Sequence, residues 1–201
     1  RVHGGALPAS PAVQDFSARE RASTGAKAVL GRIATRLIRS GQVIFLDGGT
    51  TNVQLARQLP KDLETTIVTH SPSIAVELAG HPLVQIELIG GRLFKHSVVA
   101  MGPSTAVAIA GIRIDTFVMG LTGLHLDAGA TTGDSEEAAI KRLIARQSAE
   151  TIVLATAEKL GAASPYRIMP AEAITALVTE PGTPLAAIQP FRSAGIEVIT
   201  G

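Results

Sequence analysis

Six consecutive residues have the chemistry to hold an anion: Asp47, Gly48, Gly49, Thr50, Thr51 and Asn52, at the end of the apolar run 43–47 (VIFLD). The two glycines allow a tight turn and close approach of the backbone to a ligand. The helix predicted to begin after them presents free backbone N–H groups and the positive end of its dipole. Phosphate or carboxylate binding is therefore the favoured interpretation, with an ordinary strand-to-helix turn as the alternative. The segment is neither a GxGxxG motif nor a P-loop.

Two further glycine-containing loops follow predicted strands. Gly91 and Arg92 come after the third strand, and an arginine can bind phosphate through two parallel hydrogen bonds. A simple turn with a solvated Arg92 is the alternative. Gly120 and Gly123 belong to a loop after a later strand. Three such loops at one edge of a sheet favour a pocket lined by backbone amides.

Three charged residues are candidates for the same pocket. Glu137 and Lys141 are four residues apart on a predicted helix, so they share one face of it. They form either an ordinary surface pair, with Asp134 and Glu137 as a capping box, or part of the ligand site. Lys159 follows a predicted strand, and an exposed lysine is usually only solvated. If Lys141 and Lys159 both bind the ligand, replacing either with Met should weaken binding and change folding stability little.

The sequence excludes several other kinds of site. It has no cysteine, no HExxH motif and no GxSxG motif, and its five histidines have no metal-ligand spacing. We therefore predict no catalytic residues, no metal and no cofactor. A net charge of +1 provides no field to hold nucleic acid unaided. The longest apolar runs are too short to span a membrane, and no signal peptide is evident, so a cytoplasmic location is expected.

The elements that must position these residues alternate between strand and helix. Strands are predicted at residues 43–47, 65–69, 84–89, 152–155, 176–179 and 197–200, with another within 115–120. Helices are predicted at 51–59, 72–79, 104–110 and 135–148, and from Pro184 to an early end or kink at Pro190. A first helix is predicted from a Ser17–Glu20 capping box to a C-cap at Gly41, with Lys27, Arg32, Arg36 and Arg39 on its solvent face.

This alternation predicts an α/β fold: an open, mainly parallel, Rossmann-like sheet with helices on both faces. A hydrophobic content of 46% supports a large buried core. Ligands of such sheets bind beyond the carboxyl ends of the strands, where the three loops are expected. Residues 1–16 are rich in Gly, Pro and Ala and are predicted to form a linker or arm. Residues 17–201 are predicted to form the effector-binding domain.

The order of the motifs resembles the C-terminal sensor domain of DeoR-family transcription regulators. The resemblance rests on DGGTTN at residues 47–52, TH-S at 69–71, GGRL at 90–93, MGPS at 101–104, D-x-F-x-x-G at 115–120, TTGDSEEAAIKR at 131–142 and EKLG at 158–161. The family commonly reads L-A-D-x-S-K before the last lysine, whereas this sequence has Thr156 and Glu158 in place of the Asp and Ser.

The resemblance implies a fold related to ribose phosphate isomerases, glucosamine phosphate deaminases and CoA transferases. It implies a phosphorylated sugar or related effector, held by residues 47–52 with His70, Glu137, Lys141 and Lys159 in the ligand-binding set. It also implies assembly into dimers or tetramers. Operator DNA would be bound only through a helix-turn-helix domain that lies before Arg1 and is absent from this chain.

An enzyme on the same fold is the alternative to a sensor. A sugar-phosphate isomerase needs a positioned general base, and Glu137 is the candidate. Related isomerases have an acidic loop at about the place of residues 120–123, but this segment contains no carboxylate. We therefore favour the sensor.

Overall fold

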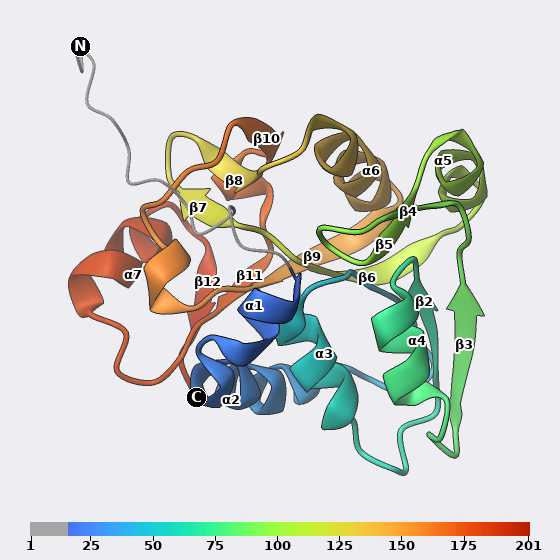
Figure 1. Cartoon of the computed structure of the whole chain (residues 1–201). Helices are drawn as coiled ribbons and strands as arrows, with labels where there is room; N and C mark the ends of the chain where they lie inside the picture. Colours follow the sequence, from blue (N-terminus) through green and yellow to red (C-terminus); the bar gives the residue numbers. More distant parts are fainter. Residues whose placement is uncertain (1–15) are drawn as a thin grey trace.

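A seven-stranded parallel sheet forms the centre of the protein, described here for residues 16–201 by a computed structural model (Figure 1). Its strand order is β12-β11-β9-β6-β1-β2-β3. The strands are β1 (Val43–Leu46), β2 (Thr65–Thr69), β3 (Val84–Leu88), β6 (Ile114–Met119), β9 (Ser148–Leu154), β11 (Ala176–Val178) and β12 (Glu197–Ile199). Every neighbouring pair in this sheet is parallel, which confirms the predicted α/β fold class.

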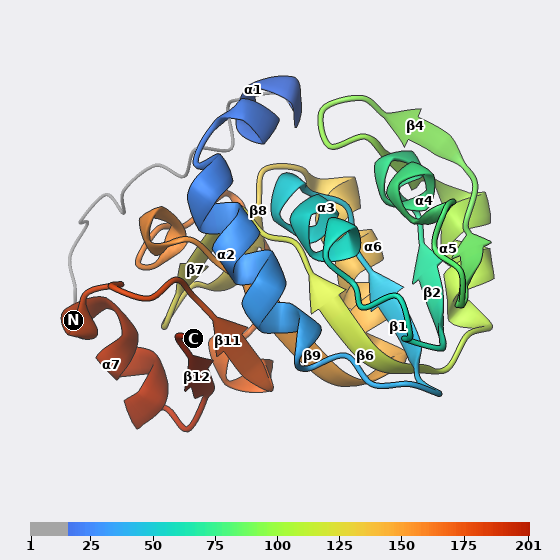
Figure 2. The same ribbon diagram turned by 90° about the horizontal axis from the view of Figure 1, so that it is seen from below.

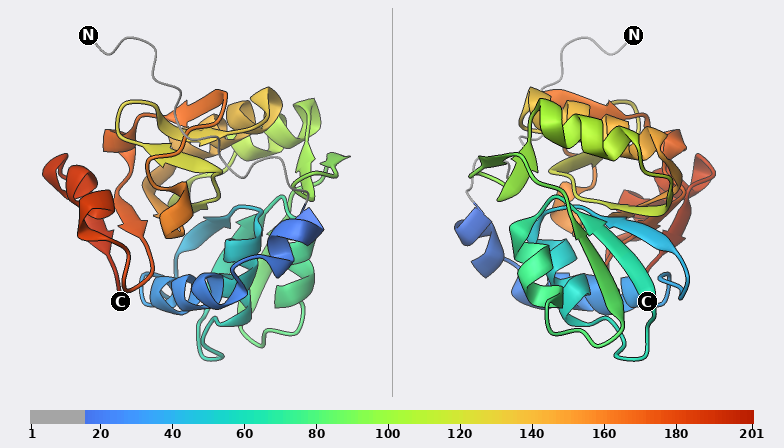
Figure 3. Two further views of the ribbon diagram at one scale, coloured as in Figure 1. Left: turned by 60° about the vertical axis from the view of Figure 1, so that its left-hand side comes forward. Right: turned by 90° about the vertical axis from the view of Figure 1, so that its right-hand side faces the viewer.

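Helices cover both faces of the sheet, as Figure 3 shows from the side. One face carries α2 (Thr24–Thr35), α3 (Thr50–Arg57) and α4 (Pro72–Leu78), and the other carries α5 (Pro103–Ala110) and α6 (Ser135–Arg146). The last helix, α7 (Leu185–Ser193), contacts β12 at one end of the sheet. No helix within residues 16–201 is long and apolar enough to cross a membrane.

Alternation along the strands divides the core between the two faces. Ile44 and Leu46 belong to the hydrophobic cluster under α2, α3 and α4, whereas Phe45 belongs to the cluster under α5 and α6. All three side chains are at most 1% exposed. Burial of each stabilises the fold by roughly 1.5–3 kcal/mol. Strands buried on both faces read as continuous apolar runs, which is why VIFL was recognisable in the sequence.

Smaller antiparallel elements surround the sheet, and the sequence analysis did not predict them. A hairpin consists of β4 (Arg92–Phe94) and β5 (Val99–Met101), and a second sheet of order β10-β8-β7 consists of β7 (Gly123–His125), β8 (Gly129–Thr132) and β10 (Tyr166–Met169). Two single 3₁₀ turns are η2 (Ala157–Lys159) and η3 (Ala171–Ala173). These strands have three or four residues each, too short for a periodic apolar pattern to identify them.

The first predicted helix is in fact two. α1 (Phe16–Arg21) and α2 are separated at Ser23, whose φ of 52° is left-handed. Ser17 lies inside α1, so its predicted capping role is wrong. The predicted arm at residues 1–16 lies outside the described residues except for Phe16, which begins α1.

Two other predicted helix ends are also wrong. α2 ends at Thr35, and Gly41 instead donates its backbone N–H to the Glu64 carbonyl oxygen at 2.8 Å, at the start of the connection to β1. Of the early end or kink predicted at Pro190, the end is wrong, because α7 continues to Ser193. By contrast, Asp134 caps α6 as predicted, because its Oδ1 accepts the Glu137 N–H at 2.9 Å.

Strand order identifies where a ligand can enter. The chain builds outward from β1 through β2 to β3, then returns to place β6 on the other side of β1. The loops after β1 and β6 therefore diverge to opposite sides and leave a crevice at their carboxyl ends. Figure 2 shows β1 and β6 side by side at this position.

Candidate functional site

A pocket of about 160 Å³ lies at this switch point between β1 and β6. The loop after β1 and the start of α3 form one wall, and the loop after β6 and the helix α6 form another. Segments from the beginning of the described chain and from η2 complete it. The polar and charged residues that line it include Arg19, Lys27, Thr50, Thr51, Asn52, Ser97, Thr122, Thr132, Glu137, Lys141, Glu158 and Lys159.

The glycines of the DGGTTN segment bring backbone, not side chains, to the pocket. Gly49 has a φ of 126°, which disfavours any residue with a Cβ. A Cβ on Gly48 would lie 2.2 Å from a methyl carbon of Val99. α3 begins directly afterwards at Thr50, and within residues 16–201 no side chain caps its N-terminus. The first turn of α3 lines the pocket and therefore presents backbone N–H donors to it.

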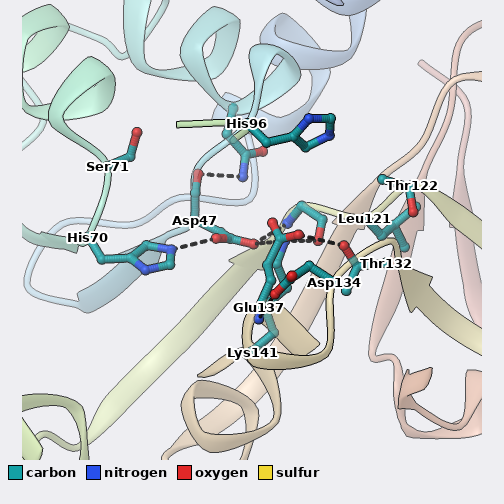
Figure 4. A network of polar contacts seen from close by, with 12 residues as sticks. Asp47, His70, Ser71, His96, Leu121, Thr122, Thr132, Asp134, Glu137 and Lys141 are labelled. Carbon is teal, nitrogen blue, oxygen red and sulfur yellow. Dashed lines mark hydrogen bonds and ion pairs between the residues drawn. The ribbon is translucent and has the colours of Figure 1, made fainter. Parts of the chain in front are cut away.

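Asp47 is fully buried and anchors the floor of the pocket (Figure 4). Its Oδ1 lies 2.9 Å from His70 Nε2, and its Oδ2 lies 2.8 Å from Lys141 Nζ and accepts the Gly120 N–H at 2.8 Å. Burial opposes ionisation, but Lys141 and His70 outweigh it and lower the pKa of Asp47 to about 2. The carboxylate therefore ties β1, β2, β6 and α6 together in its charged form.

Lys141 bridges two carboxylates. Besides Asp47, it contacts Glu137 Oε1 at 3.3 Å and donates to the Gly120 carbonyl oxygen at 2.7 Å. Glu137 Oε2 accepts the Thr132 hydroxyl at 2.7 Å. Burial lowers the pKa of Lys141, but the two carboxylates reverse this and raise it. Burial likewise raises the pKa of Glu137, and Lys141 and Thr132 more than compensate, so Glu137 is ionised.

Lys27, predicted to face solvent, is instead 5% exposed and lines the pocket. Its Nζ donates to the Ala22 carbonyl oxygen at 2.6 Å and to the Arg19 carbonyl oxygen. Burial lowers its pKa, an effect that the nearby Glu158 partly offsets. The other three basic residues of that predicted face, Arg32, Arg36 and Arg39, are exposed as expected.

Lys159 reaches the pocket from η2. Its Nζ donates to the Leu121 carbonyl oxygen at 3.0 Å. Burial, followed by the positive charges of Lys27 and Arg19, lowers the pKa of Lys159 to about 8. Glu158 also lines the pocket, and its Oε1 accepts the Thr156 hydroxyl at 3.2 Å. The two residues that depart from the family pattern thus contact each other beside Lys159.

The structure brings most of the predicted site residues together. Those that line the pocket are Gly48, Gly49, Thr50, Thr51, Asn52, Gly120, Glu137, Lys141 and Lys159. Asp47 and His70 lie behind this lining and hold it in place. The Asn52 side chain also has a positioning role, because its Nδ2 donates to the carbonyl oxygens of Asp47 at 2.9 Å and Val118 at 3.1 Å.

Three predicted residues lie apart from the pocket lining. Arg92 is exposed and pairs with Glu136 at 2.6 Å. Gly91 packs against Thr105, where a Cβ would lie 2.1 Å from the hydroxyl oxygen. Gly123 begins β7, and a Cβ there would lie 2.6 Å from the Ala162 carbonyl oxygen. In each of the three loops, close packing thus requires at least one glycine. Only the loops that contain Gly48 and Gly120 line the pocket.

Sequence reasoning missed Arg19, Lys27, Ser97 and Thr132 as pocket residues. For Lys27 a signal existed: it shares a helix face with Leu30 and Ala34, three and seven residues further on, and both are buried. Within residues 16–201, no group of His, Asp and Glu side chains is arranged to hold a metal ion.

A doubly wound domain with a cationic pocket at its switch point has the architecture of a small-molecule-binding protein. The family described as the DeoR C terminal sensor domain matches residues 22–181. The chain therefore belongs to the DeoR sensor domain family.

Curated relatives are transcription regulators. The HTH-type transcriptional regulator GlpR of Haloferax volcanii is 30% identical over all of this chain and 79% of the regulator. A putative aga operon transcriptional repressor of Escherichia coli O157:H7 is 27% identical over 99% of this chain and 76% of the repressor. The function class of this chain is thus the sensor domain of a transcription regulator.

Two solved structures are similar to part of this chain. Translation initiation factor eIF-2B of Pyrococcus horikoshii matches 69% of this chain and 48% of its own, with 16% identity and a TM-score of 0.50. Ribose 5-phosphate isomerase A of Methanocaldococcus jannaschii matches 66% of this chain and 52% of its own, with 14% identity and a TM-score of 0.48. The matches span about half of each solved chain, and the first shows a related fold.

Proposed function

We propose that the pocket binds a phosphorylated sugar or a related phosphorylated metabolite, and that occupancy controls DNA binding by the full-length regulator. The observation that carries the proposal is the excess of positive charge beside the N-terminus of α3. Lys27 and Lys159 line the pocket and donate to backbone carbonyl oxygens, whereas the charge of Lys141 is matched by two carboxylates. A dianionic phosphate would neutralise the ammonium groups of these two lysines. It would also accept hydrogen bonds from the backbone N–H groups of Thr50 and Thr51.

The same geometry argues against the isomerase alternative. A general base must accept a proton from substrate near neutral pH. Glu137 is the candidate for that role, yet Lys141 and Thr132 hold its pKa below the ordinary value. A carboxylate stabilised in this way is a weak base. We therefore propose that the pocket binds its ligand without converting it, and incubation with ribose 5-phosphate should leave the sugar unchanged by NMR.

A matched pair of ligands tests the binding proposal. Calorimetric titration with glucose 6-phosphate, glucose and inorganic phosphate should show binding of the two phosphate-containing compounds and not of glucose. Equal binding of glucose and glucose 6-phosphate would contradict the proposal, because the positive charge would then contribute nothing.

The first described residues of the chain form part of the pocket wall, which links the pocket to the N-terminal end of the domain. Arg19 and Ala22 line the pocket, and both belong to the segment that ends at the α1–α2 break. A ligand that contacts this segment can favour one arrangement of it over another, which is the differential affinity that control of a second domain requires. Operator DNA lies in the cytoplasm, so the proposal also places the full-length protein there.

Two further parts of the proposal concern assembly. We propose that the domain forms a dimer or tetramer, since palindromic operators favour proteins with two-fold symmetry. Light scattering across a wide concentration range should give at least twice the chain mass of 20.7 kDa. We also propose that this chain alone does not bind operator DNA, so a mobility shift at moderate salt should show no sequence-dependent complex.

A further inference from the structure

A second cavity, called the second lobe below, lies beside the pocket (the first lobe), between the β4–β5 turn and the N-terminus of α6. It has a volume of about 200 Å³ and shares Ser97, Thr122, Thr132 and Glu137 with the pocket already described. Its own additional lining comes from Phe94, His96 and the first residues of α6, Gly133 and Asp134. The two cavities therefore lie beside each other and share one wall.

The two lobes differ in charge. Four basic side chains, those of Arg19, Lys27, Lys141 and Lys159, line the first lobe together with the carboxylates of Glu137 and Glu158. Among the described residues, the lining of the second lobe includes the carboxylates of Asp134 and Glu137 and no lysine or arginine. Carboxylates repel a phosphate and accept hydrogen bonds only. A phosphorylated ligand is thus oriented with its phosphate in the first lobe and a donor-rich, uncharged end in the second.

The side chains of the second lobe suit the carbon chain of a sugar. One oxygen of Asp134 caps α6, and its other oxygen remains able to accept a hydroxyl. The Thr122 and Thr132 hydroxyls add groups that can donate or accept. On the opposite side, Phe94 and His96 have ring centroids 5.8 Å apart and present flat surfaces for C–H groups. Figure 4 shows His96 across from Thr122, Thr132 and Asp134.

The β4–β5 turn is held in place from outside the lobe. The Arg19 guanidinium donates to the His96 carbonyl oxygen at 2.7 Å, and Figure 2 shows α1 beside this turn. Val98, at the end of the turn, has a φ of 53°, which is rare for a β-branched residue. The turn therefore has a defined shape, although its sequence carries no recognised motif.

We propose that the second lobe binds the hydroxyl-bearing carbon chain of the effector, and that Phe94, His96 and Asp134 determine which phosphorylated sugar is accepted. This proposal rests on the proposed function of the pocket. It assigns affinity for phosphate to the first lobe and discrimination between sugars to the second.

Alanine substitutions in the turn provide the first test. We expect Phe94→Ala and His96→Ala each to weaken the binding of the best ligand among glycerol 3-phosphate, ribose 5-phosphate and glucose 6-phosphate by about three- to tenfold. Inorganic phosphate should bind to both variants as it does to wild type. Lys95→Ala is the matched control, because Lys95 is exposed on the same turn and does not line either lobe.

Neutralising the acidic side provides the second test. Asp134→Asn preserves the helix cap, since asparagine caps helices as well as aspartate does. Wild type should prefer glucose 6-phosphate to 6-phosphogluconate, whose carboxylate would enter the acidic lobe, and Asp134→Asn should reduce this preference by about tenfold.

The outcomes distinguish this proposal from the one on which it rests. Unchanged ligand preference in all three variants, or equal losses for sugar phosphates and inorganic phosphate, would overturn the assignment of the second lobe and leave phosphate binding intact. If wild type bound neither inorganic phosphate nor any phosphorylated sugar, both proposals would fall.

Discussion

Two groups of charged side chains form and support the pocket, and they differ in how their charges are balanced. On the α6 side, Asp47, Glu137 and Lys141 form a closed network in which each charge has an opposite charge within 3.3 Å. On the η2 side, Lys27 and Lys159 donate to backbone carbonyl oxygens, and burial followed by the positive charge of Lys27 lowers the pKa of Lys159. The first group is complete without a ligand, whereas the proposed function has a bound anion complete the second.

This difference assigns separate roles to lysines of the same pocket. A buried charge that is matched within the protein contributes to the folded state, and its removal leaves its partners unpaired. A charge without an opposite charge nearby in the protein opposes folding, and it favours the binding of a ligand of opposite charge. Substitution of Lys141 and of Lys159 tests whether the two groups have these separate roles.

The largest effect should come from Lys141→Met. The substitution leaves Asp47 and Glu137 buried without their counter-charge, which should destabilise the fold by about 3–5 kcal/mol. For a chain of this size the melting temperature should fall by roughly 10 °C. Urea unfolding without ligand measures this. The double variant Asp47→Asn/Lys141→Met should recover part of the loss, and a single variant as stable as wild type would show that the network is not required for folding.

The alternative of an ordinary surface pair is wrong, because the side chains of Glu137 and Lys141 are both buried. Glu137 and Lys141 were recognisable as a pair because helix geometry brings residues four apart together. Their burial was not recognisable, because it depends on Asp47, which approaches from a distant strand. Local spacing predicts which residues share a helix face, but only the assembled sheet decides whether that face is solvated.

The same limit explains what else was and was not predicted. The central strands and the DGGTTN turn were predicted well, since buried parallel strands form continuous apolar runs and glycines mark the tight turn after β1. The β4–β5 turn was missed because its strands have three residues each. Lys27 was placed on the solvent face because a lysine on a helix is usually exposed, although it is aligned with the buried Leu30.

Lys159→Met should show the opposite behaviour to Lys141→Met. A charge-assisted hydrogen bond contributes roughly 1.5–3 kcal/mol, so affinity for inorganic phosphate and sugar phosphates should fall about ten- to a hundredfold. The free energy of unfolding without ligand should not fall. Within the described chain, Lys159 donates only to a backbone carbonyl oxygen, and the substitution removes its charge repulsion with Lys27 and Arg19. Calorimetry and urea unfolding on one sample measure both quantities. A large loss of stability with unchanged affinity would reverse the roles assigned to the two groups.

A smaller effect should appear in the pH dependence of binding. The pKa of Lys159 is lowered to about 8, so the ammonium form that attracts an anion is lost as the pH rises through 8. Phosphate affinity should therefore decrease by up to about tenfold between pH 7.5 and 9, and binding near pH 8 should take up a proton. Calorimetry in buffers of different ionisation enthalpy measures this uptake.

Folding has the opposite pH dependence through the same group. The unfolded chain, with an ordinary lysine pKa of 10.5, retains the proton between pH 8 and 10.5, whereas the folded chain has released it. The contribution of Lys159 to stability therefore becomes more favourable as the pH rises through this range. Lys159→Arg, which remains charged, should abolish both the proton uptake on binding and this rise in stability. An unchanged pH dependence in Lys159→Arg would assign the titration to another group.

The smallest effect should come from Arg92→Ala, and it tests the boundary of the pocket. An arginine after a glycine pair at this sheet edge is a reasonable phosphate ligand from the sequence, but its side chain is 66% exposed and pairs with Glu136 at 2.6 Å. Exposed ion pairs contribute about 0.2–1 kcal/mol to stability because water screens them, so unfolding should change by no more than this. Affinity for inorganic phosphate should remain within about twofold of wild type, since Arg92 does not line the pocket. Glu136→Gln is the matched control, and it should reproduce the small stability change. A tenfold loss of phosphate affinity in Arg92→Ala alone would show that the β4 strand moves toward the pocket when ligand binds, and that the positive charge on the η2 side is not sufficient to hold the anion.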